Sequence, residues 1–127
     1  MRHERHYTLQ QASAARTWVA ERVNWIRDAQ ATLTSLGSRA AEAIAALDVH
    51  AGGSYPGLDV ARPLVELSRA VGELEAVEVV VRDVERGLVD FPAIRDGEEV
   101  YLCWLLDEAE IRFWHYPGAG FAGRQPL

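Results

Sequence analysis

The sequence has no lysine, a single cysteine and no long apolar run, and each absence narrows what the protein can be. With Cys103 as the one cysteine, an intramolecular disulfide cannot form, which excludes a disulfide-stabilised secreted fold. No apolar stretch approaches the roughly 20 residues that span a membrane. The polar N-terminal residues do not resemble a signal peptide. We therefore expect no membrane association and a location in the cytoplasm of a bacterium or archaeon.

The charge balance is acidic. All 13 basic residues are arginine, 19 residues are acidic, and the net charge is −6. An acidic chain repels phosphate backbones, so binding to nucleic acid, RNA or the ribosome included, is disfavoured. The 127 residues are 49% hydrophobic, which is enough for one packed core. We expect a single domain over residues 1–127.

Helical spacing dominates the first part of the chain. Thr8 and Gln11 form a capping-box pattern, which predicts a helix N-terminus. From there, apolar residues recur at alternating spacings of three and four, and the phase continues across Gly37. The pattern predicts one long helix over residues 8–48, with a break at Gly37 as the alternative.

A second helix is predicted after a loop. Residues 49–58 are rich in glycine and proline and are typical of a loop. Pro63 fits the first turn of a following helix, where its missing N–H is not needed. Together these segments predict an antiparallel helical hairpin over residues 8–76. Trp18 and Trp25 widen its apolar face.

After Ala76 the spacing of apolar residues changes from the three-to-four repeat of a helix to the two-residue repeat of a strand. β-branched and alternating segments predict strands at residues 77–81, 88–94, 99–106 and 110–116. Asp96 and Gly97 mark a tight hairpin turn. We expect an antiparallel meander of three to four strands over residues 77–116, followed by a tail at residues 117–127. The fold class is therefore α+β.

The predicted register of the last two strands assigns their faces. We place one apolar set opposite another: Val100, Leu102 and Trp104 against Ile111, Phe113 and His115. The remaining face is also too apolar for full exposure: Tyr101, Cys103, Arg112, Trp114 and Tyr116. It needs a cover from the helices, the tail or another subunit.

Two residues in the strands are candidates for chemistry. His115 ends the last strand, where it could serve as a general base or metal ligand, or simply bond a backbone group. Asp90 interrupts an apolar strand and needs a partner, such as Arg82, Arg112 or Arg124 across the sheet. A structural ion pair is favoured over a catalytic carboxylate.

Other candidates are weaker. Cys103 reads as a small buried thiol, because no cysteine–histidine spacing indicates a nucleophile. His3 and His6 supply two metal ligands at most. Glu110, in the last hairpin turn, is a weak metal candidate together with His115. No P-loop, HExxH or CxxC motif occurs, so no cofactor is expected.

The chain resembles a prokaryotic family of unknown function, DUF2203 (domain of unknown function 2203). The resemblance rests on residues 7–12, 85–93, 100–104, 114–115 and 120–127. It departs at residues 107–109 and 116–117, where the family more often has Gly-Glu-Pro and an acidic residue. The resemblance implies no known activity, and it puts four residues first for testing: Asp90, Trp104, His115 and Arg124.

Two functional hypotheses follow. The first is a non-enzymatic assembly or protein-interaction module that forms a homo-oligomer, most simply a dimer, through its helices. The second is a small-ligand or metal-binding protein, an enzyme included, with a site at the sheet. That site would use His115 with Asp90 or Glu110, and Arg124 for an anion.

Overall fold

The N-terminal helix α1 (Leu9–Ala46) is continuous, so the prediction that it passes through Gly37 without a break is confirmed. Its predicted capping box is also present. The backbone N–H of Gln11 donates to Thr8 Oγ1 at 3.1 Å, and the Thr8 N–H donates to Gln11 Oε1 at 3.0 Å. These two bonds satisfy N–H groups that the first turn would otherwise leave unpaired.

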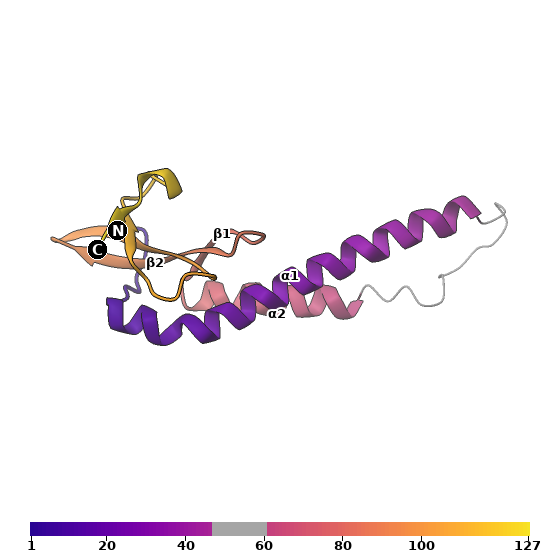
Figure 1. Ribbon diagram of the computed structural model, residues 1–127. Coiled ribbons are helices and arrows are strands. Elements are labelled where there is room, and N and C mark those ends of the chain that lie inside the picture. The colour runs from indigo at the N-terminus through magenta and orange to yellow at the C-terminus, as the bar shows by residue number, and fades with distance from the viewer. Residues whose placement is uncertain (47–60) are drawn as a thin grey trace.

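The computed structural model describes residues 1–46 and 61–127; for residues 39–46 it describes the backbone alone. The predicted loop at residues 49–58 lies outside them. Helix α2 (Ala61–Ala76) carries Pro63 in its first turn, as predicted, and packs beside α1 (Figure 1). In the described part of the chain, no helix is long and apolar enough to cross a membrane.

An antiparallel sheet follows the helices, which confirms the α+β class. Its strands are β1 (Val80–Asp83), β2 (Leu88–Arg95), β3 (Glu98–Leu105), β4 (Phe113–His115) and β5 (Gln125–Pro126), adjacent in chain order. The sheet has five strands, against the three to four predicted. The tail supplies the extra strand because, after a 3₁₀ turn at η1 (Phe121–Gly123), it returns along β4.

The turn between β2 and β3 is the predicted two-residue turn. Asp96 and Gly97 both have positive φ, 51° and 79°, which gives the twist that a tight hairpin needs. This turn fixes the register of the longest strand pair, in which Asp90 lies opposite Cys103. Pro92 lies inside β2, but its carbonyl faces the chain before α1 and accepts the Tyr7 N–H at 2.6 Å. On that side Pro92 faces the segment before α1 and not a neighbouring strand, so the N–H that proline lacks is not needed for strand pairing.

The predicted core face is confirmed for β3, where Val100, Leu102 and Trp104 all join the core, but the predicted face of the last strand is wrong. Tyr101 pairs with His115 and Leu102 with Trp114, so His115 lies on the face away from the core. The prediction assumed an extended strand from residue 110, whereas β4 begins at Phe113. Ile111 and Trp114 are three residues apart and both join the core, so strict alternation fails between them.

The core lies between the helices and one face of the sheet. It is formed by buried apolar residues of α1, β2, β3 and β4: Val19, Val23, Ile26, Val89, Phe91, Leu102, Trp104 and Trp114. The opposite face carries the buried polar side chains of Asp90 and His115, and both ends of the chain lie near the sheet (Figure 1). On that face His3 Nε2 meets Tyr101 Oη at 2.8 Å, and Arg124 reaches the carbonyl of Cys103.

Candidate functional site

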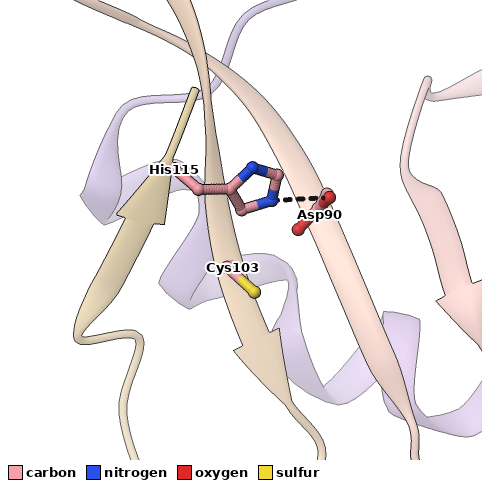
Figure 2. A group of neighbouring side chains, drawn as sticks. All are labelled: Asp90, Cys103 and His115. Carbon is pink, nitrogen blue, oxygen red and sulfur yellow. Dashed lines mark hydrogen bonds and ion pairs between the residues drawn. The ribbon is translucent and has the colours of Figure 1, made fainter. Parts of the chain in front are cut away.

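Three potential metal ligands meet on the sheet face opposite the helices. Asp90 comes from β2, Cys103 from β3 and His115 from β4 (Figure 2). All three side chains are buried, and their ligand atoms all lie within 4.8 Å of one another. The strand register brings them together. Asp90 lies directly opposite Cys103. His115 lies opposite Tyr101, which is two positions before Cys103 on the same face of β3.

Both ring nitrogens of His115 have a hydrogen-bond partner. Nδ1 is 2.8 Å from the carbonyl oxygen of Tyr116, which can only accept, so Nδ1 carries a proton. Nε2 is 2.9 Å from Oδ2 of Asp90. A hydrogen bond there needs one further proton, on either the imidazole or the carboxyl group. The pair therefore holds a proton that a metal ion could displace.

The predicted ion pair of Asp90 is formed with Arg82 from β1. Arg82 Nε donates to Asp90 Oδ2 at 2.8 Å. Burial by itself would lower the pKa of Arg82, but the hydrogen bond and charge of Asp90 raise it, so the guanidinium stays charged. The second carboxylate oxygen, Oδ1, is buried and has no hydrogen-bond partner within the residues described. An unpaired buried oxygen is costly, so this atom needs a partner, which the Cys103 thiol beside it, a water molecule or a bound ligand can supply.

The thiol of Cys103 is unsuited to nucleophilic catalysis. Burial, together with the negative charge of Asp90, raises its pKa to about 12, so the thiol is protonated at neutral pH. Both ring nitrogens of His115 face oxygen atoms, so the imidazole is not placed to take the thiol proton. A coordinated metal ion changes this, because a thiol bound to a metal is deprotonated outright.

Arg124, a predicted site residue, lies beside the cluster and bonds the backbone of Cys103. Its Nη2 donates to Glu108 Oε1 at 2.6 Å and to the backbone carbonyl of Cys103 at 3.4 Å. The guanidinium also lies over the rings of Phe113 and Phe121, at 4.1 and 4.9 Å from their centroids. These contacts fasten the tail against β3 and β4.

Two other predicted residues lie elsewhere. Trp104 faces the helical core, and its indole N–H donates to the Glu108 carbonyl at 2.9 Å. Glu110 is exposed and pairs with Arg112 at 3.4 Å. The structure therefore brings Asp90 and His115 together. Trp104 and Glu110 lie away from this pair.

The N-terminal histidines bind different partners and do not share a site. His6 Nε2 lies 2.8 Å from Glu99 Oε2. His3 Nδ1 lies 3.3 Å from Glu78 Oε1. The backbone N–H groups of Arg2 and His3 also donate to Glu99. These bonds hold the segment before α1 against the sheet.

Sequence reasoning missed the part that Cys103 plays. A signal was present, because a two-residue turn at Asp96 and Gly97 pairs residues at equal distances on either side. Asp90 lies six positions before Asp96, and Cys103 lies six positions after Gly97. Counting outward from the turn would have placed the carboxylate beside the thiol.

The fold and this cluster define a two-layer α+β protein with a buried Asp–Cys–His site on the sheet face away from the helices. The chain belongs to the family described as Uncharacterized conserved protein (DUF2203), whose model matches residues 5–127. The resemblance noted in the sequence is thereby confirmed. No curated protein and no solved structure matches the chain. The family brings no activity, so function has to be argued from the site.

Proposed function

We propose that this protein binds a divalent transition-metal ion through Asp90, Cys103 and His115 and uses it to hold a small ligand. The observation that carries the proposal is the buried Asp90 Oδ1, which has no hydrogen-bond partner in the described part of the chain and belongs to a cluster with a thiol and an imidazole. A metal ion would satisfy this oxygen and replace the proton that His115 and Asp90 share.

The donor set indicates the kind of metal. A thiolate and an imidazole suit Zn²⁺ or Co²⁺, whereas Mg²⁺ and Ca²⁺ prefer oxygen ligands. Tetrahedral coordination with bonds of 2.0–2.3 Å separates ligand atoms by roughly 3.3–3.8 Å. The three donor atoms lie within 4.8 Å of one another, so small side-chain adjustments would suffice.

The number of ligands favours a binding or catalytic site. Structural zinc sites have four protein ligands, whereas sites that act on a ligand have three and an open fourth position. The cluster supplies three among the residues described. Arg82 would hold Asp90 in place through its Nε bond, as a neighbour that orients a metal ligand. We place the protein in the cytoplasm, where reducing conditions keep Cys103 available.

Metal analysis of untagged protein, purified without chelators, tests this proposal. We expect stoichiometric metal in the wild type, or stoichiometric uptake of Zn²⁺ or Co²⁺ by the apoprotein. Cobalt should give the near-ultraviolet absorption of a thiolate–metal bond. Cys103→Ser should abolish that band, and His115→Ala should lose most of the metal.

Matched controls are available in the other histidine and acidic candidates. His6→Ala and Glu110→Gln should retain the metal, because neither side chain belongs to the cluster. Circular dichroism would confirm that each variant is folded. Trace metal in the wild type with no uptake would show that the cluster is a structural ion-pair network. Uptake by Cys103→Ser and His115→Ala that equals uptake by the wild type would show the same.

Self-association through the helices is a second candidate. Helix α1 has 38 residues and α2 has 16, so at 1.5 Å per residue they span about 57 and 24 Å. Helix α2 can therefore cover less than half of α1. Apolar side chains also remain exposed on the helices: Trp25, Leu64, Val65 and Val71. We propose that a second copy covers them in a two-fold dimer.

Sedimentation at micromolar concentration tests the dimer. Val65 is 65% exposed, so Val65→Glu should leave the monomer folded and shift the equilibrium towards it. Glu66→Gln, on the neighbouring exposed position, is the control and should not change the distribution. A wild-type protein that sediments as a monomer would reject this second candidate.

A further inference from the structure

A small cavity lies over the metal-ligand cluster. Its volume is about 240 Å³, and besides Asp90, Cys103 and His115 it is lined by Arg2, Arg82, Leu88, Gly118, Gly120 and Phe121. At about 30 Å³ per water molecule, this space corresponds to roughly eight waters. The cavity therefore has room for a small molecule of a few non-hydrogen atoms.

The charges around this cavity differ from those of the chain as a whole. The protein has a net charge of −6, yet two arginines line the cavity, and Asp90 is the one acidic residue among its lining residues in the described part of the chain. A divalent metal would be neutralised by the Asp90 carboxylate and the Cys103 thiolate. Arg2 and Arg82 would then leave an excess of positive charge, which favours an anion.

Arg82 is built to serve both the metal ligand and an anion. Its Nε is bonded to Asp90, and its guanidinium lies 5.0 Å from the centroid of the Tyr101 ring. The side chain is 41% exposed, so part of it is accessible. A guanidinium has five N–H donors, and its terminal amino groups fit the paired oxygens of a carboxylate or phosphate.

We infer that the ligand is a small oxyanion, carrying a carboxylate or phosphate group, that binds in this cavity. One oxygen takes the open position on the metal, and Arg82 and Arg2 bind the others. The inference rests on the metal site proposed above and adds the chemical class of its ligand.

The test uses the full-length, untagged protein loaded with Co²⁺. Inorganic phosphate, acetate and methylammonium are titrated in turn while the visible absorption of the cobalt is followed. We expect phosphate or acetate to change the visible bands saturably, because an oxygen enters the coordination shell, and methylammonium to change nothing. The arm with the tighter binding identifies the group that is recognised.

Two arginine variants test the anion site, each compared with the wild type in protein that still shows the thiolate–cobalt band, because Arg82 also bonds the metal ligand Asp90. Arg82→Gln should weaken anion binding about tenfold or more, as expected for loss of a charge-assisted contact. Arg2→Gln should weaken it by a smaller factor and, on an exposed residue, leaves the fold intact. Arg112→Gln, on an exposed arginine outside the cavity, should bind as the wild type does.

The two proposals fail in different ways. If the thiolate–cobalt band forms but neither anion changes the spectrum, or if both cavity variants bind as tightly as the wild type, the oxyanion inference is wrong and the metal site stands. If the thiolate band never forms, the metal site itself is wrong, and the inference falls with it.

Discussion

Nε2 of His115 lies 2.9 Å from Oδ2 of Asp90, with both side chains almost completely buried. The two residues are 25 positions apart in the chain and lie on strands separated by β3. Arg82 bonds the same oxygen from the other side. Buried charges of this kind persist because each has a partner, so the removal of one should destabilise the others.

Replacement of Asp90 should therefore be costly even without metal. We expect Asp90→Ala to lower the free energy of unfolding by about 3–5 kcal/mol, because His115 and Arg82 lose their shared acceptor. Urea denaturation in the presence of a chelator measures this. Glu110→Ala removes an exposed ion pair and should change stability by less than about 1 kcal/mol. Equal effects in the two variants would contradict the reading of Asp90 as the centre of a buried network.

Two glycines should respond oppositely to the same substitution. Gly87 has a φ of +68°, and an added Cβ would lie 2.7 Å from Nη2 of Arg27 and 3.1 Å from Cβ of Leu106. Gly87→Ala should therefore destabilise by at least about 1–2 kcal/mol. Gly72 lies in α2 with nothing within 4 Å of an added Cβ, and Gly72→Ala should stabilise by about 0.5–1 kcal/mol. Thermal or urea unfolding measures both, and a shift of the same sign would be inconsistent with the structure.

Glu99 should make stability depend on acid pH. Burial would raise its pKa, but the His6 side chain and the N–H groups of Arg2 and His3 lower it to about 2, from 4.5. The stabilisation is fully present above pH 4.5, where the carboxyl would also be ionised in the unfolded chain. It is lost as the pH falls towards about 2, because the unfolded chain then takes up the proton more readily.

The measurement is a series of urea unfolding curves across this acid range. Wild-type stability should fall steeply as the pH decreases, and Glu99→Gln should show a shallower dependence. Glu98→Gln, at the exposed start of β3, is the matched control and should follow the wild type. Identical pH dependence in all three proteins would mean that Glu99 does not hold the N-terminal segment as described.

The helix cap gives a fourth prediction. Thr8→Ala removes the side-chain acceptor for the Gln11 N–H and should cost about 1 kcal/mol of stability. Thr17→Ala, at an exposed position inside α1, places a better helix former and should be neutral or slightly stabilising. Urea unfolding distinguishes the two, and an unchanged Thr8→Ala protein would mean that the cap adds nothing measurable.

Local rules predicted most of the architecture, because the features concerned are set by near neighbours. The cap at Thr8, the turn at Asp96 and Gly97, and the start of α2 near Pro63 each depend on a few adjacent residues. The same locality explains why the continuity of α1 could be read from spacing alone. The single-domain assignment stays a prediction.

The site was harder to predict because it depends on pairing between distant segments. Ile111 and Trp114 both enter the core, so the phase of β4 could not be obtained by alternation from Ile111, and His115 was placed on the wrong face. The return of the tail as β5 carried no sequence signal, because its two residues, Gln125 and Pro126, lack a strand pattern. Asp90 was correctly matched to an arginine, yet three were possible, and Arg82 was selected by β1 pairing.

The tight turn at Asp96 and Gly97 has a consequence for insertions and deletions. Adding one residue within β3 before Cys103 would rotate the thiol to the side of the helices and leave Asp90 where it is, because successive side chains alternate between faces. Lengthening residues 107–112, between β3 and β4, would not change that count. The thiol and the carboxylate therefore stay side by side only while Asp90 and Cys103 keep the same number of residues to the tip of this hairpin.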